Sequence, residues 1–246
     1  QKEGTGSVPD RLAIVQQRLS LLGLDALLIF DTRNVRYLTG FTGSDGCCIL
    51  RPGEASLLVD GRYLTQARQQ AQGVTVVLYR DRLSALAEAL QNGTVQTVGF
   101  ESSAVTVDFY NQMKGRLPGI HLEPCTEEVE RLRRTKDHTE LALILRAIEV
   151  SHEALKATLP LIRPGARERD IAVALEYGMR RLGAEDLAFP VIVATGPHAA
   201  QPHAEPGEGV IQPGDGVTID YGAVVGGYSS DETCTILLDP VDPEMK

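Results

Sequence analysis

The sequence predicts an α/β domain followed by an α+β domain, and three observations lead to this prediction. Strand-like and helix-like segments alternate through residues 1–125, as in an open α/β layer domain. A charged helical stretch, residues 126–137, marks the expected linker or entry helix. In residues 138–246, two helices are followed by short strands rich in glycine and proline, as in an α+β domain.

The first domain opens with a helix, because apolar residues recur at helical spacing from Leu12 to Leu22 and Gly23 ends the pattern. The apolar run 25–30 predicts a buried strand. Two apolar runs flank Arg51-Pro-Gly-Glu54 and predict a hairpin. The alternation then continues with a helix near 62–72, a strand at 74–78, a helix near 83–90 and a strand at 95–100.

The second domain begins with the strongest helix pattern of the chain. Asp137 and Glu140 form a capping-box pattern ahead of the helix. Its apolar positions at helical spacing are Leu141, Leu145, Ile148, Leu155 and Leu159. Arg163-Pro-Gly165 is expected to end this helix, and Gly183 a second one over 168–182. Strands are predicted at 190–195, 216–223 and 228–238.

Length and composition exclude several classes of protein. The chain has 246 residues, 43% of them hydrophobic, which is ordinary for a globular protein and high for a disordered one. No apolar run reaches the roughly 18 residues of a membrane span, and residues 1–4 do not resemble a signal peptide. Four cysteines without a CxxC spacing form neither a disulfide framework nor a zinc site. We therefore expect a reducing, cytoplasmic setting.

The net charge of −9 is concentrated near the end of the sequence. Residues 182–246 hold eleven acidic side chains and a single basic one, Lys246. Such a segment repels nucleic acids and anionic membranes, so we expect neither as a partner. Composition leaves two interpretations open, a solvated acidic face and a cation site.

Two aspartates in adjacent predicted strands are the candidates for such a cation site. A two-residue turn at Val225-Gly226 would place Asp220 directly opposite Asp231, with Cβ atoms about 5 Å apart. Two like charges in that position destabilise a sheet unless something offsets them. The candidates are a shared proton, a basic neighbour and a divalent cation. Asp220 also follows Ile219 in an apolar strand, where a buried carboxylate must be paired or bind a metal.

A metal site at this pair would have a hydroxyl nearby that can orient a ligating carboxylate. Thr233 lies two residues past Asp231, on the same face of the strand, where its hydroxyl can hold a carboxylate oxygen. Carboxylates suit hard or borderline ions such as Mn²⁺, and one carboxylate can bridge two ions about 3.5–4 Å apart. A solvent-facing pair and a proton-sharing dyad remain the alternatives, and a bulge would break the register.

His203 is the other candidate for chemistry. It lies in a loop rich in glycine and proline after a short predicted strand, where binding groups often occur. A neutral histidine beside a reacting group can donate a hydrogen bond or transfer a proton. An exposed loop histidine without a role is the alternative, and His198 has the weaker claim of the two.

These residues fall in motifs that resemble the Xaa-Pro peptidases, a family of metallopeptidases that includes proline-specific aminopeptidases and prolidases. The resemblance covers nearly the whole chain. It is carried by Asn34-Val-Arg-Tyr-Leu-Thr-Gly-Phe-Thr-Gly43, Val59-Asp-Gly-Arg-Tyr-Leu-Thr-Gln66, Leu132-Arg-Arg-Thr-Lys136 with Glu140, Thr195-Gly-Pro, Pro202-His203, Asp220-Tyr-Gly and Gly227-Tyr-Ser-Ser-Asp-Glu-Thr233. It implies a creatinase-like N-terminal domain, residues 1–125, and a catalytic domain of the pita-bread fold from residue 138.

The resemblance also implies residue roles and a reaction. Asp220 would bind one metal ion, Asp231 would bridge two, and His203 would contact the substrate and the tetrahedral intermediate. The implied cofactors are two divalent ions, Mn²⁺ first and Co²⁺ or Zn²⁺ as alternatives. The implied reaction releases an N-terminal residue that precedes proline, by attack of a metal-bridging hydroxide on the Xaa–Pro carbonyl. The expected partners are the peptide substrate and a second copy of the chain in a homodimer.

The sequence departs from the family pattern in two ways. Cys234 stands where the family commonly has arginine. The family also completes its site with one histidine and two glutamates from a later segment, so we expect the pita-bread domain to be incomplete in residues 138–246 and this chain alone to be inactive.

Three alternatives to an aminopeptidase follow from the same fold. The first is a prolidase acting on Xaa-Pro dipeptides. The second is a non-catalytic binding module, a class that usually loses the ligand residues retained here. The third is a metal-free hydrolase resembling creatinase, which the presence of both aspartates disfavours.

Overall fold

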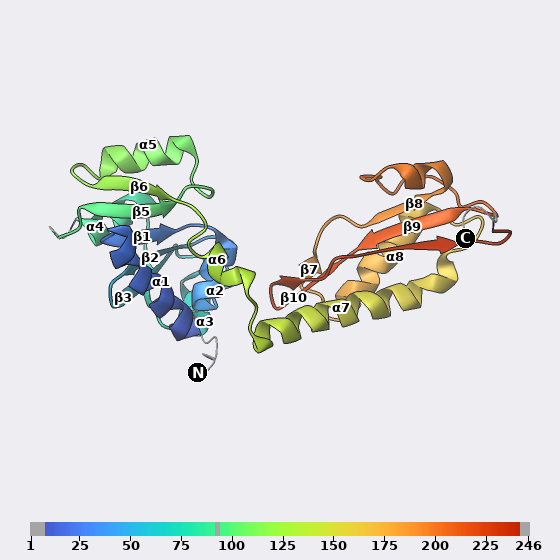
Figure 1. The fold of residues 1–246 in the computed structure, drawn as a ribbon, viewed down its shortest axis with the longest axis horizontal. Helices are drawn as coiled ribbons and strands as arrows, with labels where there is room; N and C mark the ends of the chain where they lie inside the picture. The colour runs from blue at the N-terminus through green and yellow to red at the C-terminus, as the bar shows by residue number, and fades with distance from the viewer. Residues whose placement is uncertain (1–7, 92–93, 242–246) are drawn as a thin grey trace. The chain divides into compact units, whose positions relative to one another are not determined.

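The computed structural model describes residues 8–91 and 94–241, and residues 1–4 and Lys246 of the sequence analysis lie outside them. The chain forms two compact units, Gln1–Asp137 and His138–Lys246 (Figure 1). In the described part of the chain, no helix is both long enough and apolar enough to cross a membrane.

The first unit is built on a six-stranded sheet with the strand order β4-β3-β2-β1-β5-β6. All strands run parallel except β2, which is antiparallel to both β1 and β3. The β2–β3 pair confirms the hairpin predicted around Arg51-Pro-Gly-Glu54. The strands are β1 (Ala26–Ile29), β2 (Cys47–Arg51), β3 (Glu54–Val59), β4 (Thr75–Leu78), β5 (Thr97–Glu101) and β6 (His121–Cys125).

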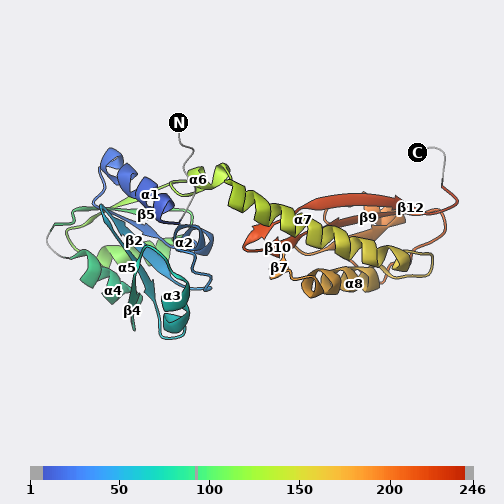
Figure 2. The ribbon, with the colours of Figure 1, turned by 90° about the horizontal axis from the view of Figure 1, so that it is seen from below.

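Helices cover both faces of this sheet, which confirms the α/β class (Figures 1 and 2). One face packs against α1 (Val8–Leu22), α2 (Thr32–Thr39) and α3 (Leu64–Gln70), and the other against α4 (Arg82–Leu90) and α5 (Val107–Arg116). Leu19 of α1 and Leu86 of α4 are fully buried on opposite sides. Helix α6 (Glu130–Arg134) follows within the same unit. The structure adds α2, α5 and β6, which the sequence patterns had not indicated.

The second unit combines two helices with antiparallel strands, which confirms the α+β class. Its three-stranded sheets have the orders β12-β9-β8 and β11-β10-β7. Helices α7 and α8 lie on one side of the β12-β9-β8 sheet (Figure 2), where Val150 and Leu175 join a core with Val217 and Ile219. The elements are α7 (His138–Thr158), α8 (Glu168–Arg181), β7 (Asp186–Leu187), β8 (Ile192–Thr195), β9 (Gly216–Tyr221), β10 (Ala223–Val225), β11 (Tyr228–Ser229), β12 (Glu232–Leu237) and the 3-10 turns Leu159–Leu161 and Gly196–Ala200.

Helix α7 forms as predicted, but only some of its predicted apolar positions, among them Leu155, pack against the core. Leu141 and Leu145 are 49% and 65% exposed. Apart from Glu140 in the first turn, the buried residues of the helix are small, namely Ala147, Val150, Ser151, Ala154 and Thr158. Small residues are required there because Gly178 of α8 packs so closely that a Cβ on it would lie 3.3 Å from Cβ of Ala154.

The end of α7 also differs from the prediction. The helix ends at Thr158 rather than at Arg163-Pro-Gly165, and a 3-10 turn follows. Pro160 explains the early end, because proline cannot donate the backbone hydrogen bond that would continue an α-helix.

Candidate metal centre

The hairpin that carries the two aspartates has a different register from the predicted one. Thr233, and not Asp231, lies opposite Asp220 across β9 and β12. The turn is Gly226-Gly227, because Val225 pairs with Tyr228. Both glycines have positive φ, 60° and 81°, as this tight turn requires. A β-branched valine avoids that region, so the prediction of a Val225-Gly226 turn with Asp220 directly opposite Asp231 is wrong.

The shifted register still leaves both carboxylates on one polar face of the sheet. Exposure alternates along the end of the hairpin, so that Asp231, Thr233 and Thr235 are exposed while the residues between them are half-buried. Asp220 is half-buried between buried Ile219 and Tyr221, and it shares the face of its neighbour Thr233. Asp220 and Asp231 are therefore diagonal neighbours, a relation that places Cα atoms about 7–8 Å apart in a regular antiparallel pair.

Thr233 has the contact that the sequence analysis expected of it. Its hydroxyl donates a hydrogen bond of 2.8 Å to Oδ1 of Asp220. Among the described residues, no other hydrogen bond to the Asp220 carboxylate occurs, so Oδ2 keeps its acceptor capacity. On the same face, the hydroxyls of Thr218 and Thr235 are 3.1 Å apart. A cavity of about 380 Å³ opens beside this second threonine pair.

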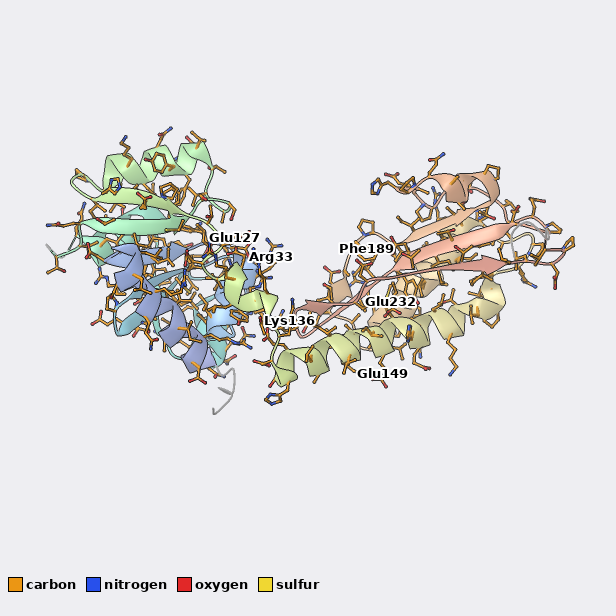
Figure 3. All side chains as sticks on the ribbon, viewed as in Figure 1. Arg33, Glu127, Lys136, Glu149, Phe189 and Glu232 are labelled. Carbon is orange, nitrogen blue, oxygen red and sulfur yellow. The ribbon has the colours of Figure 1, made fainter. Side chains whose placement is uncertain are left out.

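The chain on either side of Asp231 is fixed to helix α7. Buried Ser230 accepts a hydrogen bond from the Ala223 amide through its Oγ, which also lies 3.0 Å from Oγ of Ser151 on α7. Glu232 points to the same helix (Figure 3), where its carboxylate contacts the Ser151 hydroxyl and Nε2 of His152. Asp231 therefore projects from a segment whose two neighbours are anchored on the opposite side of the sheet.

The approach of the two strands before Asp231 leaves no room for a side chain at Gly222. A Cβ on Gly222 would lie 2.2 Å from the carbonyl oxygen of Ser230.

Cys234 lies on the helix side of β12 and packs against the core, which raises the pKa of its thiol through burial. The residue that replaces the family's arginine therefore faces away from the polar face with the aspartates.

His203 lies in the loop after β8, where it is exposed. Within residues 8–91 and 94–241, no hydrogen bond or ion pair joins it to Asp220 or Asp231. His198, the weaker candidate, has a defined partner, because its Nδ1 lies 2.9 Å from Oε1 of Glu168. The sequence analysis missed Glu168, and no local pattern signals it, because its three hydrogen-bond partners lie 27 to 39 residues further along the chain.

Glu168 is a charged residue inside the second unit, where it is only 1% exposed. Its carboxylate accepts hydrogen bonds from the amides of Thr195 (2.9 Å) and Gly207 (3.1 Å) as well as from His198. Burial alone would raise its pKa. The hydrogen bonds from His198, Gly207 and Thr195 outweigh burial and hold the pKa of Glu168 below its ordinary value.

The donors on the polar face fit part of a divalent metal site. Asp220 and Asp231 supply carboxylate oxygens, which Mn²⁺ accepts well, and Thr233 supplies the outer hydrogen bond that ligating carboxylates usually have. The described residues contain no group of three or more histidine, cysteine, aspartate or glutamate side chains placed to hold a metal ion. The two aspartates thus fit as two of the ligands and do not form a complete site.

Comparison with known proteins gives matches over nearly the whole chain. Residues 11–135 match the Creatinase/Prolidase N-terminal domain, and residues 142–246 match Metallopeptidase family M24. The peptidase YqhT of Bacillus subtilis is 33% identical over 92% of this chain and 64% of its own length. The Xaa-Pro dipeptidase of Pyrococcus horikoshii is 29% identical over 91% of this chain and 62% of its own length. The chain therefore spans less than two thirds of these two relatives.

Solved structures show the same similarity. An Xaa-Pro dipeptidase from Bacillus anthracis superposes with a TM-score of 0.92 at 30% identity, over 97% of this chain and 67% of its own. An X-Pro aminopeptidase from Thermotoga maritima superposes with a TM-score of 0.86, also at 30% identity, over 93% of this chain and 67% of its own.

Proposed function

Since this chain belongs to the Xaa-Pro peptidases of metallopeptidase family M24, we propose that it is part of an aminopeptidase that hydrolyses the bond between an N-terminal residue and a following proline. The observation that carries the proposal is the pair Asp220 and Asp231 on one polar face of the β12-β9-β8 sheet. A second observation supports it, because Thr233 already holds one oxygen of Asp220 at 2.8 Å.

In this proposal Asp220 and Asp231 would hold the divalent ions, Asp220 as a ligand of one and Asp231 as a ligand shared by two. The ions, Mn²⁺ or else Co²⁺ or Zn²⁺, would supply an activated water and neutralise the negative charge that develops on the carbonyl oxygen. The Thr233 hydroxyl fixes the orientation of the Asp220 carboxylate, and the anchors on Ser230 and Glu232 restrict the position of Asp231. Two carboxylates are too few for two ions, so the site would need ligands beyond Asp220 and Asp231.

His203 contacts the substrate in the same proposal. Its ring would donate a hydrogen bond to the carbonyl oxygen of the bond that is cleaved, where negative charge accumulates in the transition state. The prolyl bond is a tertiary amide without an N–H group, so the site must recognise the shape of the ring. The cavity of about 380 Å³ beside Thr218 and Thr235 lies on the same face of the sheet as the two aspartates.

The test is peptide hydrolysis by the protein at the length of its relatives. With Mn²⁺ it should cleave an Xaa-Pro dipeptide or an Xaa-Pro-Xaa tripeptide, and Asp231→Ala should abolish turnover because a bridging ligand is lost. Glu149→Ala is the control, because Glu149 is an exposed carboxylate on α7 (Figure 3) and should have no effect. Equal activity of Asp231→Ala and the parent protein would refute the assignment.

The same assay separates the alternatives. Cleavage of the dipeptide alone would make the protein a prolidase, the activity for which several relatives are named. A protein that binds no Mn²⁺ in calorimetry and cleaves neither peptide would be a binding module. Activity on creatine that survives a chelator would indicate a metal-free hydrolase. We also propose a homodimer, which light scattering of the purified protein tests.

A further inference from the structure

The loop between β8 and the segment that returns to α8 is closed by one buried carboxylate. We call residues 196–207 the His203 loop. Glu168 accepts a hydrogen bond from the amide of Thr195, just before the loop, and another from the amide of Gly207, its last residue. One side chain on the first turn of α8 therefore holds both ends of a twelve-residue segment.

A third hydrogen bond reaches the first part of the loop. Nδ1 of His198 lies 2.9 Å from Oε1 of Glu168. Because a carboxylate can only accept, Nδ1 must carry the proton, which fixes the tautomer of the His198 ring. His198 lies five residues before His203, so Glu168 fixes the loop on the side from which the chain enters His203.

The backbone of α8 reinforces the returning end of the loop. The amide of Glu168 donates to the carbonyl of Gly209 at 3.0 Å, and the amide of Arg169 donates to the carbonyl of Gly207 at 3.2 Å. Gly209 is packed so tightly that a Cβ on it would lie 2.8 Å from the Glu168 carboxyl carbon. The loop is thus seated on Glu168 by close packing as well as by hydrogen bonds.

The energetics single out Glu168 among the acidic residues near this loop. Burial of a carboxylate is costly unless each oxygen is hydrogen-bonded, and Glu168 is 1% exposed with donors to both oxygens. Glu208 also lies beside the loop, where it pairs with Arg167 and Arg169, but all three side chains are exposed. Exposed ion pairs contribute little, so the loop depends on Glu168 rather than on Glu208.

We propose that Glu168 is a positioning residue that holds the His203 loop through Thr195, His198 and Gly207, and so places His203 where it meets the substrate. The consequence for catalysis rests on the proposed function. The claim that Glu168 fixes the loop is independent of the proposed function, because it follows from contacts within the second unit.

The experiment combines hydrogen exchange with kinetics on the protein at the length of its relatives, loaded with Mn²⁺. In Glu168→Gln, the side-chain amide places a donor where the carboxylate accepted, so exchange in peptides covering 196–207 should accelerate about tenfold or more. Exchange in β9 and β12 should stay unchanged, which separates local loosening from unfolding. The kcat/KM for an Xaa-Pro peptide should fall about 10- to 100-fold through misplacement of His203. The affinity for Mn²⁺ should stay at the parent value.

Two further variants complete the design. His198→Ala removes one of the three donors to Glu168, and because the His198 side chain is half-exposed this variant should fold readily. Hydrogen exchange and kcat/KM should change in the same direction as in Glu168→Gln, but by a smaller factor. Glu208→Gln is the matched control, an exposed carboxylate beside the same loop, and should leave both readouts at the parent values.

The outcomes separate this proposal from the proposed function. Parent-like hydrogen exchange of the His203 loop in both Glu168→Gln and His198→Ala would overturn the claim that Glu168 fixes the loop, whether or not the parent hydrolyses peptides. Faster exchange with unchanged kcat/KM would overturn the positioning role. A parent protein that cleaves no Xaa-Pro peptide would refute the proposed function, while faster exchange in Glu168→Gln would still support the hold of Glu168 on the loop.

Discussion

At the scale of single residues, the Thr233 hydroxyl contacts Asp220, the residue that we propose as a metal ligand. It donates to Oδ1 of Asp220 at 2.8 Å and so restricts rotation of the carboxylate. Loss of such an outer hydrogen bond typically costs 10- to 100-fold in metal affinity. We therefore expect Thr233→Val, which keeps the shape of the side chain, to weaken Mn²⁺ binding about tenfold in calorimetry.

The same strand provides the control for this prediction. Thr235 lies two residues further along on the same exposed face, but its hydroxyl meets Thr218 and not a carboxylate. Thr235→Val should therefore leave Mn²⁺ affinity unchanged. An equal loss in both variants would show that the effect comes from the sheet in general and not from the hydrogen bond to Asp220.

The shared face of Asp220, Asp231 and Thr233 was predictable from the sequence because it depends on a local rule. Side chains two residues apart in a strand share a face, and a hairpin brings two such faces together. Glu168 illustrates the opposite case. It is buried only because the chain returns at Thr195, His198 and Gly207, and no local spacing predicts that return. The part of the site that depends on tertiary contacts was therefore not predictable.

At the scale of elements, the register of the hairpin differs from the predicted one, although the residues that determine it are visible in the sequence. The symmetry of the two strand-like segments predicts a turn at Val225-Gly226, which would bring Asp220 and Asp231 into register. Backbone conformation favours Gly226-Gly227 instead, since both positions need positive φ and only the glycines adopt it without strain. Had the conformational preference been given priority, the diagonal relation of the two aspartates would have been predictable.

The packing of α7 against α8 gives a prediction at the same scale. Ala154 is fully buried and faces Gly178, where no space remains for a larger side chain. Ala154→Leu should destabilise the second unit by about 1–3 kcal/mol through overpacking, measured as the free energy of urea unfolding. Ala157→Leu is the control, since Ala157 is exposed on the same helix and the change should stay within about 0.5 kcal/mol. If Ala154→Leu were tolerated as well as its control, the close contact between the helices would be wrong.

At the scale of the whole molecule, the order of the elements was predictable and the choice of packing faces was less so. Alternation of strand and helix patterns gave the α/β class, and two helices followed by short strands gave the α+β class. On α7, Leu141 and Leu145 are exposed and Leu155 packs against the core, whereas Ala154 makes the close contact with α8 because close helix packing selects for small size. Hydrophobicity patterns indicate where a helix forms more reliably than they indicate which neighbour it meets.

Glu101 in the first unit and Glu168 in the second are both buried carboxylates, and their pKa values shift in opposite directions. In the first unit, Glu101 is 6% exposed, and burial raises its pKa above the ordinary 4.5 despite hydrogen bonds from the Phe30 and Asp31 amides and the Asn34 side chain. In the second unit, the hydrogen bonds to Glu168 lower its pKa below 4.5. The favourable contribution of Glu101 is thus present below pH 4.5 and is lost as the pH rises through its folded pKa. That of Glu168 is present above pH 4.5 and is lost as the pH falls through its folded pKa.

This opposition predicts opposite pH responses when each residue is compared with its own glutamine variant. The free energy of unfolding of the parent minus that of Glu101→Gln should decrease as the pH is raised from about 4 to 8, because only the glutamate becomes charged in a buried site. The free energy of unfolding of the parent minus that of Glu168→Gln should instead decrease as the pH is lowered from about 5 to 3. Protonation of Glu168 removes an acceptor from three donors. Urea unfolding across this range measures both differences, and each subtraction removes the titration of all other groups. A common direction for the two differences would contradict at least one of the assigned shifts, and flat differences would show that neither carboxylate changes its pKa on folding.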